Sequence, residues 1–170
     1  MKIKIKDQIP DTEIFHLVEG EPRISKIKEI LGTGKIILFG LPGAFTSTCS
    51  KFHLPGYVAN ADKLKQKGIQ NIFCISVNDP YVMDAWGQAH NIENKIIMLS
   101  DPYLSFTKAI GAEVDRNSRG MGIRSNRYSM VIENLQVSNI QVEKETKECG
   151  LSSAEGILAV SYTHLRAHET

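Results

Sequence analysis

A short apolar segment, 35–41 (KIILFGL), constrains the fold of this chain more than any other feature. Gly34 precedes the segment and Pro42-Gly43 follow it, and glycine and proline are typical of turns and loops. The segment is too short for a buried helix, whereas a strand buried on both faces of a sheet has this length and this uninterrupted apolar character. It therefore predicts a central strand of a sheet that helices cover on both sides.

Strand and helix patterns alternate after this segment. Gly68 is expected to end the first helix, and Asp79 to cap the second beside a proline at the first helical position. Asp101 and Pro102 repeat that arrangement for the third helix. The expected elements are strand 35–41, helix 49–67, strand 69–77, helix 80–90, strand 95–99 and a short helix ending at Ile110. This order is typical of an α/β fold.

The remainder of the chain predicts an antiparallel edge for this sheet. A Gly-, Arg- and Ser-rich loop is expected over 111–126, followed by a hairpin of strands 127–133 and 137–142. Ser152, with Glu155 three residues later, has the pattern of a capping box and predicts a last helix. The predicted fold class is therefore α/β, with a central mixed β-sheet flanked by helices.

Length and charge favour one compact domain that does not bind polyanions. The chain has 170 residues, and 20 Lys plus Arg against 19 Asp plus Glu give a net charge of +1. We expect a single domain over residues 1–159, with no nucleic-acid and no membrane partner. The start, 1–7 (MKIKIKD), alternates charge with Ile where a signal peptide has a continuous apolar core, so an unexported protein in a reducing compartment is expected.

The end of the sequence differs from the rest. Residues 160–170 (VSYTHLRAHET) show no helical apolar face. They resemble the translation of a transposase-type sequencing-library adapter, and we therefore expect a non-native tail; the alternative is a genuine frayed terminus. His164 and His168 lie in this segment and are not considered as metal ligands.

The chain has three cysteines: Cys49, Cys74 and Cys149. Their spacing excludes a CxxC redox motif and paired zinc knuckles, and no HExxH, GxGxxG or GxxxxGK(S/T) motif occurs. Any cysteine chemistry must therefore lie outside these motifs.

Cys49 lies where the first predicted strand passes into its helix, in the segment 41–50 (LPGAFTSTCS). Unpaired N–H groups and the positive end of the helix dipole favour a thiolate in a first helical turn. The same N–H groups can hold one oxygen of a substrate while the thiolate attacks a neighbouring oxygen. Thr46 can accept from one such oxygen and donate to the other. The alternative is a small buried cysteine without chemistry.

The pattern Pro42-x-x-x-Thr46-x-x-Cys49 resembles the active site of the peroxiredoxins. Segments 49–56 (CSKFHLPG), 75–80 (ISVNDP) and 127–131 (RYSMV) are similar to the type II, peroxiredoxin-5-like group, and the resemblance covers residues 3 to 159. It implies a thioredoxin-like fold and chemistry that needs no metal and no cofactor. It also implies reduction of hydrogen peroxide and alkyl hydroperoxides by Cys49, which becomes a sulfenic acid.

The resemblance further implies roles for three residues around this cysteine. Thr46 would orient the peroxide, Pro42 would shield the pocket, and Arg127 would place a positive charge near thiolate and peroxide. Arg124 competes for the last role, but only Arg127 has the Arg-Tyr-Ser-Met context, so Arg124 is expected to be a solvated charge. His53 would share a helical face with Cys49, and we expect a core histidine rather than a base.

Oxidised Cys49 could be reduced by three routes. The first is an external thiol, glutathione with glutaredoxin. The second is Cys74, which resembles the resolving cysteine of some plant-like members but would need local unfolding, since a disulfide requires Cα atoms within about 7 Å. The third is Cys149, near the place where other members carry a C-terminal resolving cysteine but two positions before it. An internal disulfide would make thioredoxin the natural reductant.

The sequence thus predicts a thiol peroxidase. A glutathione-linked thiol transferase and a non-enzymatic redox sensor or holdase would use the same nucleophile. Thr46 and Arg127 favour the peroxidase because they are needed to polarise an O–O bond. By the resemblance we also expect a homodimer and a cytoplasmic location.

Overall fold

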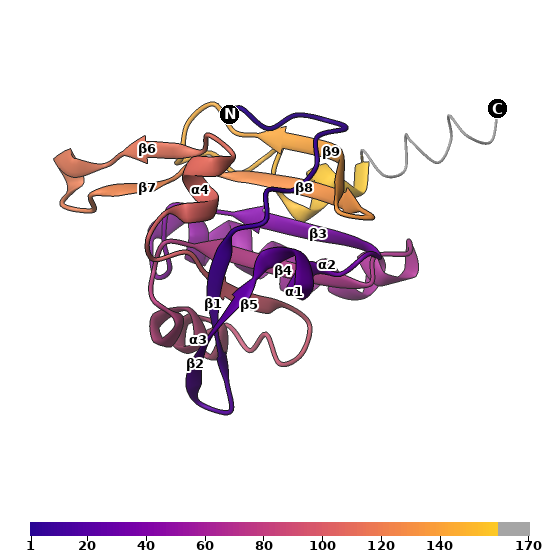
Figure 1. Ribbon diagram of the computed structural model, residues 1–170, viewed down its shortest axis with the longest axis horizontal. Coiled ribbons are helices and arrows are strands. Elements are labelled where there is room, and N and C mark those ends of the chain that lie inside the picture. Colours follow the sequence, from indigo (N-terminus) through magenta and orange to yellow (C-terminus); the bar gives the residue numbers. More distant parts are fainter. Residues whose placement is uncertain (160–170) are drawn as a thin grey trace.

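The computed structural model describes residues 1–159, so the expected non-native tail, 160–170, lies outside the described residues. A seven-stranded mixed sheet runs through the molecule in the order β2-β1-β5-β4-β3-β8-β9 (Figure 1). Its middle is formed by β3 (Lys35–Gly40), β4 (Asn71–Ser76) and β5 (Ile97–Ser100), which are parallel. The three predicted apolar segments are therefore the adjacent central strands.

The antiparallel edge also forms as predicted. β8 (Tyr128–Glu133) pairs with β3 and with β9 (Gln136–Val142). Asn134 and Leu135 connect β8 to β9, and both have a positive φ, which is the backbone of the tight turn that hairpins favour. This hairpin brings the residue before β8, Arg127, to the carboxyl end of β3.

The sequence analysis missed the opposite edge of the sheet. β1 (Glu13–Val18) and β2 (Glu21–Lys26) form a hairpin through Glu19-Gly20, and β1 pairs with β5. All residues of β2 are exposed or only partly buried, so they give no continuous apolar pattern. Two short strands were missed as well. β6 (Glu113–Asp115) and β7 (Ile123–Ser125) pair within the predicted loop 111–126.

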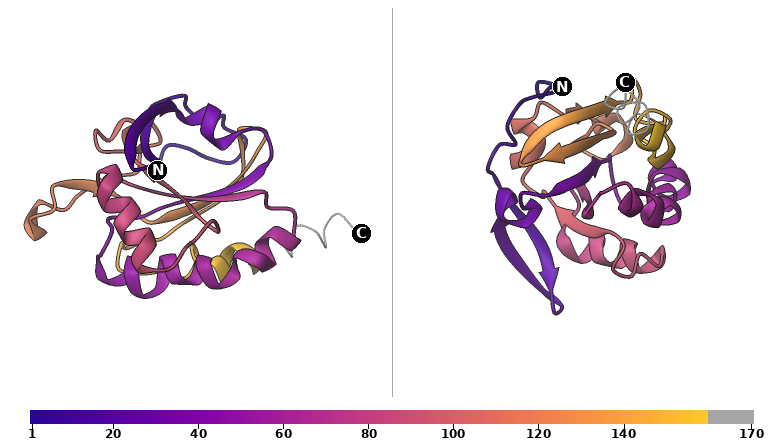
Figure 2. Two further views of the ribbon diagram at one scale, coloured as in Figure 1. Left: turned by 90° about the horizontal axis from the view of Figure 1, so that it is seen from below. Right: turned by 90° about the vertical axis from the view of Figure 1, so that its right-hand side faces the viewer.

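Helices cover both faces of the sheet, as the central strands require (Figure 2). α2 (Leu54–Gln66), α3 (Pro80–Ala89) and the helical residues 154–159 pack on one face. The N-terminal segment, α1 (Ile27–Leu31) and α4 (Ser105–Ala109) pack on the other. Alternate residues of β3 divide between the two cores, with Ile37 and Phe39 in the first and Ile36 and Leu38 in the second.

Two of the predicted helix starts need correction. Asp79 caps α3 as expected, because its Oδ1 accepts from the Val82 N–H at 3.0 Å. Asp101 also binds N–H groups of α4, but that helix begins at Ser105, so Pro102 does not lie in its first turn. The capping residue of the last helix is Ser153, whose Oγ accepts from the Gly156 N–H at 3.0 Å. The predicted cap, Ser152, is instead buried beneath the helix start.

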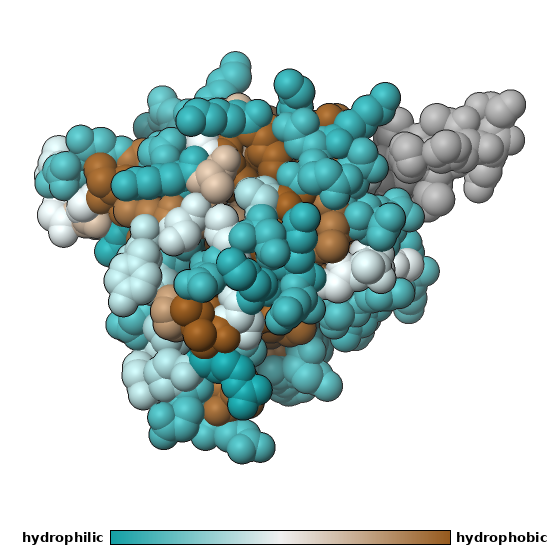
Figure 3. Space-filling view, in the orientation of Figure 1, coloured by the Kyte–Doolittle hydropathy of each residue, from teal (hydrophilic) through white to brown (hydrophobic). Residues whose placement is uncertain are grey.

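The face in Figure 3 is mostly hydrophilic, and its apolar areas are separate from one another. No helix within residues 1–159 is long and apolar enough to span a membrane.

Candidate active site

Cys49 lies at the start of the helical segment that follows β3. Ser47 and Thr48 are already helical, and Cys49 opens a π-helical turn, η1 (Cys49–His53), which continues into α2. The sequence places this cysteine in the first helical turn, and the structure agrees. Its side chain is fully buried. N–H groups at the start of a helix generally lack a partner within the helix, so this position favours a negative charge on the sulfur.

Arg127 makes the closest polar contact of the sulfur. Its Nη2 donates to Cys49 Sγ at 3.0 Å, across 78 residues of sequence. Its Nε donates to the Thr146 carbonyl at 3.0 Å, and its Nη1 lies 2.8 Å from His53 Nδ1. Arg127 is only 1% exposed, so all three contacts form out of water, where charge-assisted hydrogen bonds are strong.

Thr46 and Pro42 lie in the loop that joins β3 to this helix. The Thr46 hydroxyl donates to the Gly43 carbonyl at 2.6 Å. With its proton used in this way, Thr46 Oγ1 keeps acceptor capacity but no free donor. This differs from the expectation that Thr46 both accepts from and donates to substrate. The Pro42 carbonyl accepts from Arg124 Nη1 at 3.2 Å.

Arg124 is therefore not the solvated charge that the sequence analysis expected. It is partly buried, and it donates from Nε to the Met121 carbonyl and from Nη1 to the Pro42 carbonyl. Burial lowers the pKa of Arg124, and the nearby Cys49 opposes that shift. A side chain at Gly43 would meet Arg124 Nη1 at 2.7 Å, so glycine permits this approach. Arg124 braces the loop, while Arg127 contacts the sulfur.

Asn78 is a residue of the site that sequence reasoning missed. Its Oδ1 accepts from the Ala44 N–H at 2.8 Å and from the Ser76 hydroxyl at 2.7 Å. It thereby ties the loop before Cys49 to the end of β4. The signal available in the sequence was its place directly after a predicted strand, where polar residues of a parallel sheet gather near the site.

His53 is buried, as expected, but it is not an isolated core residue. Its Nδ1 faces Arg127, and its Nε2 lies 3.2 Å from the Ser152 carbonyl. Burial, and then the charge of Arg127, lower the pKa of His53 well below its usual value. Tyr57 and Ser129 also donate to the Ser152 carbonyl. Ser152, just before the last helix, is thus hydrogen-bonded to the helical segment that carries Cys49.

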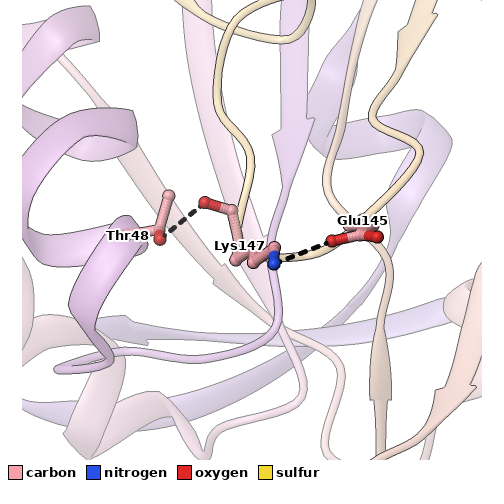
Figure 4. Close-up of polar contacts among 3 residues, drawn as sticks. All are labelled: Thr48, Glu145 and Lys147. Carbon is pink, nitrogen blue, oxygen red and sulfur yellow. Dashed lines mark hydrogen bonds and ion pairs between the residues drawn. The ribbon is translucent and has the colours of Figure 1, made fainter.

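The segment 143–150 closes the site from the side of β9. The Thr48 hydroxyl donates to the Lys147 carbonyl at 3.0 Å, and the Lys147 ammonium pairs with Glu145 at 3.2 Å (Figure 4). Glu143 is buried, and its Oε1 accepts from the N–H groups of Gly150 and Ser152 and from the Ser152 hydroxyl. A single carboxylate oxygen therefore binds the chain at both Gly150 and Ser152, directly after Cys149.

Cys149 is the more accessible of the other two thiols. It is partly exposed, and burial raises its pKa to about 11; Arg127 opposes this shift and Glu143 adds to it. Cys49 and Ser152 also influence its ionisation, so Cys149 lies in the electrostatic environment of the site.

Cys74 has a different environment. It is fully buried in the middle of β4, opposite Phe39 of β3 and Met98 of β5. Burial, and then the charge of Cys49, raise the pKa of Cys74 well above its usual value. Cys74 and Cys49 are both free thiols in this structure.

Trp86 of α3 reaches the same helical turn. Its indole Nε1 donates to the Ser50 hydroxyl at 3.0 Å, directly beside Cys49. Within residues 1–159, no three His, Cys, Asp or Glu side chains are grouped so as to hold a metal ion.

Known proteins share this architecture over nearly the whole chain. The family model "Redoxin" matches residues 4–158. Peroxiredoxin-2D of Arabidopsis thaliana is 41% identical over 157 residues, which are 92% of this chain and 96% of the relative. Peroxiredoxin-2C of Oryza sativa subsp. japonica is 39% identical, with the same two coverages.

Solved structures agree with the sequence relatives. Reduced Prx3 of Vibrio vulnificus, crystallised in complex with H2O2, superposes with a TM-score of 0.88 and 43% identity, covering 94% of this chain and 99% of that one. Peroxiredoxin 5 of Alvinella pompejana superposes with a TM-score of 0.83 and 34% identity, covering 95% of this chain and 99% of that one. The mixed sheet with helices on both faces is thus the predicted thioredoxin-like fold, and the chain belongs to the Redoxin family and, within it, to the peroxiredoxins.

Proposed function

We propose that this peroxiredoxin reduces hydrogen peroxide and organic hydroperoxides with Cys49 as the attacking thiolate. The observation that carries the proposal is the 3.0 Å contact between Arg127 Nη2 and Cys49 Sγ in a buried site. The guanidinium keeps its charge at any physiological pH, so it stabilises the thiolate and the negative charge that develops during attack.

The proposed step is a displacement at oxygen. The Cys49 thiolate attacks one peroxide oxygen, an S–O bond forms and the O–O bond breaks. The sulfur is oxidised to the sulfenic level, and the other oxygen leaves as hydroxide or alkoxide, which takes up a proton to become water or alcohol. N–H groups of the first helical turn and Arg127 are placed to stabilise that leaving oxygen.

Thr46 and Pro42 are proposed to position the peroxide and to protect the sulfur. Since the Thr46 hydroxyl donates to the Gly43 carbonyl, its oxygen is available as an acceptor for the O–H of a hydroperoxide. Pro42 lies in the same loop, which Arg124 and Asn78 brace from two sides. A loop held in this way keeps both residues in place without help from the substrate.

We propose an external thiol, glutathione acting with glutaredoxin, as the first reductant of oxidised Cys49. The sulfenic acid and one thiol form a mixed disulfide and release water, and a second thiol then releases the reduced protein and a disulfide. The position of Cys74 in the middle of β4 and the raised pKa of Cys149 support an external route. Of the two internal candidates, Cys149 is favoured by its partial exposure; thioredoxin would then be the reductant.

A homodimer is part of the proposal. Phe45 and Phe52 flank Cys49 in the sequence, and they are 58% and 62% exposed. Large exposed aromatic side chains are enriched at protein interfaces. Sedimentation equilibrium tests the dimer, and Phe52→Glu is expected to shift the equilibrium toward monomer.

Peroxide-dependent turnover is the decisive test of the function. We expect NADPH-coupled turnover with glutathione, glutaredoxin and glutathione reductase, and no turnover in Cys49→Ser. Cys149→Ser is the matched control and is expected to keep this activity. A mixed disulfide in the mass of the peroxide-treated protein would support the external route, whereas loss of two hydrogens would indicate an internal disulfide. Consumption of only one equivalent of peroxide would contradict catalysis and favour a redox sensor.

A further inference from the structure

His53 connects the arginine of the site to the end of the domain, and no step of the proposed chemistry uses it. Its Nδ1 lies 2.8 Å from Arg127 Nη1 and its Nε2 lies 3.2 Å from the Ser152 carbonyl. A guanidinium has donors and no acceptor, so Nδ1 must accept from Arg127. A carbonyl accepts only, so Nε2 must carry the proton. Both contacts are satisfied together only by the neutral Nε2–H tautomer.

The surroundings of His53 favour that neutral form. The imidazole packs against Phe39 and Tyr57, with ring centroids 4.8 Å and 5.6 Å away. Arg127 is the charged side chain in contact with it, and the Tyr57 hydroxyl is occupied with the Ser152 carbonyl. Arg127 also contacts Cys49 Sγ, and the Tyr57 hydroxyl is also hydrogen-bonded to the Ser129 hydroxyl. A second positive charge on His53 would therefore face Arg127 out of water.

These contacts also exclude His53 as the base for Cys49. The Nδ1 lone pair is used by Arg127, and Nε2 already holds a proton, so no nitrogen is free to take the proton of the thiol. The contact with the sulfur is made by Arg127 and not by the imidazole. Any effect of His53 on the reaction must pass through the guanidinium.

We propose that His53 is a positioning residue that fixes the rotation of the Arg127 guanidinium, so that Nη2 points at Cys49 Sγ. This inference rests on the proposed peroxidase function. The guanidinium is planar, so an acceptor at Nη1 and the Thr146 carbonyl at Nε together determine where Nη2 lies. Without the acceptor at Nη1, a buried N–H of Arg127 would lack a hydrogen-bond partner, which favours rotation of the guanidinium toward another acceptor.

Two substitutions separate the two ends of the imidazole. In His53→Asn the amide Oδ1 takes the place of Nδ1 and keeps an acceptor for Arg127. In His53→Gln the amide nitrogen takes the place of Nε2, so the donor to Ser152 is kept and the acceptor for Arg127 is lost. A positioning role through Arg127 predicts that Asn preserves the reaction better than Gln; a packing role predicts no such order.

The readout is the second-order rate constant for oxidation of Cys49 by hydrogen peroxide, followed by rapid quench and mass spectrometry. His53→Gln is expected to lower this rate about 10²-fold, the cost of a small displacement of a catalytic group. The rate constant of His53→Asn is expected to be at least about tenfold higher than that of His53→Gln. His16→Gln, in the remote β1, is the matched control and should leave the rate unchanged.

A double-substitution cycle tests whether the effect passes through Arg127. If His53 acts only by orienting the guanidinium, His53→Gln adds nothing once Arg127→Gln has removed it. Equal losses in both backgrounds would overturn the proposal. So would a His53→Gln rate equal to that of the unsubstituted chain.

A measurement on the unsubstituted chain covers the case in which His53→Gln does not fold. Long-range ¹H–¹⁵N spectra of ¹⁵N-histidine-labelled protein report which imidazole nitrogen carries the proton. The proposal predicts a neutral His53 with its proton on Nε2 at neutral pH, and an imidazolium or an Nδ1–H tautomer would overturn it. Absence of peroxide oxidation in the unsubstituted chain would refute the peroxidase function instead, so the two failures are distinguishable.

Discussion

Arg127 Nη2 and Cys49 Sγ lie 3.0 Å apart although 78 residues separate them in the chain. The pairing of β3 with β8 makes this contact, because it places the end of β3, which leads to Cys49, beside the start of β8. The central sheet therefore sets the distance between nucleophile and cation.

Replacing Arg127 should affect the reaction more than the fold. Arg127→Lys keeps a charge but loses the planar fork that bonds Thr146, His53 and Cys49 simultaneously. We expect the rate constant for peroxide oxidation to fall by about 10²-fold or more, the usual cost of removing one preorganised donor. Stopped-flow kinetics of Cys49 oxidation measure it, with the exposed Arg23→Lys on β2 as control. A Lys variant with the rate of the unsubstituted chain would contradict the role of the fork.

The sequence predicted the part of the site whose residues are close together in the chain. The segment from β3 through Thr46 to Cys49 is contiguous, so its strand, loop and helix could be predicted from the order of its residues alone. The β1–β2 edge and the β6–β7 pair were not predicted, because β2 is exposed or only partly buried and β6 and β7 have three residues each, so none of them has a continuous apolar pattern.

Contacts between distant residues could not be derived from spacing. His53 meets Ser152 across 99 residues. The capping-box pattern pointed to Ser152, because Glu155 follows it by three residues. The structure assigns the cap to Ser153 because Ser152 is held by Glu143. Arg127 could be chosen over Arg124 only through a family resemblance, since the two lie three positions apart in the sequence, Arg124 in β7 and Arg127 directly before β8.

Stability should decline in mild acid because of His53. Its pKa in the folded chain is well below the usual 6.5, first because of burial and then because of Arg127. Between the unfolded and folded values the unfolded chain binds more protons, so the free energy of unfolding falls as pH drops below about 6.5. Urea titrations at several pH values in this range should show the free energy of unfolding decrease as the pH falls. In His53→Asn the free energy of unfolding should depend less on pH. His16→Gln removes a more exposed histidine whose pKa is lowered less, so the slope should change less. An identical slope in His53→Asn would contradict this assignment.

Glu143 should stabilise the turn around Cys149. Its Oε1 accepts three hydrogen bonds, from the Gly150 N–H, the Ser152 N–H and the Ser152 hydroxyl. Glu143→Ala leaves the buried donors of Ser152 without this acceptor and should lower the free energy of unfolding by about 2–3 kcal/mol. The matched control, Glu145→Ala, breaks only the exposed pair with Lys147 seen in Figure 4 and should change it by less than about 1 kcal/mol. Urea unfolding measures both variants. Equal decreases in the free energy of unfolding for Glu143→Ala and Glu145→Ala would show that the hydrogen bonds of the buried Glu143 contribute little to stability.

The two other thiols should differ in their reaction with iodoacetamide. The pKa of Cys149 is raised to about 11, so its alkylation should still increase about tenfold per pH unit between pH ~8 and ~10. Cys74 is fully buried and should react only after unfolding. Peptide mass spectrometry in the Cys49→Ser background separates the two sites. A Cys149 rate that levels off below pH ~9, or rapid labelling of Cys74 in the folded chain, would contradict these environments.

The hydrogen bond between Trp86 and Ser50 gives the molecule an intrinsic optical probe. The chain contains one tryptophan, and its indole is bonded to the residue next to the reactive sulfur. Tryptophan emission from the protein therefore comes from a single indole that is bonded to the first turns of the helix that carries Cys49. Oxidation of the sulfur, or fraying of that turn when a reductant binds, would change its intensity without any added label.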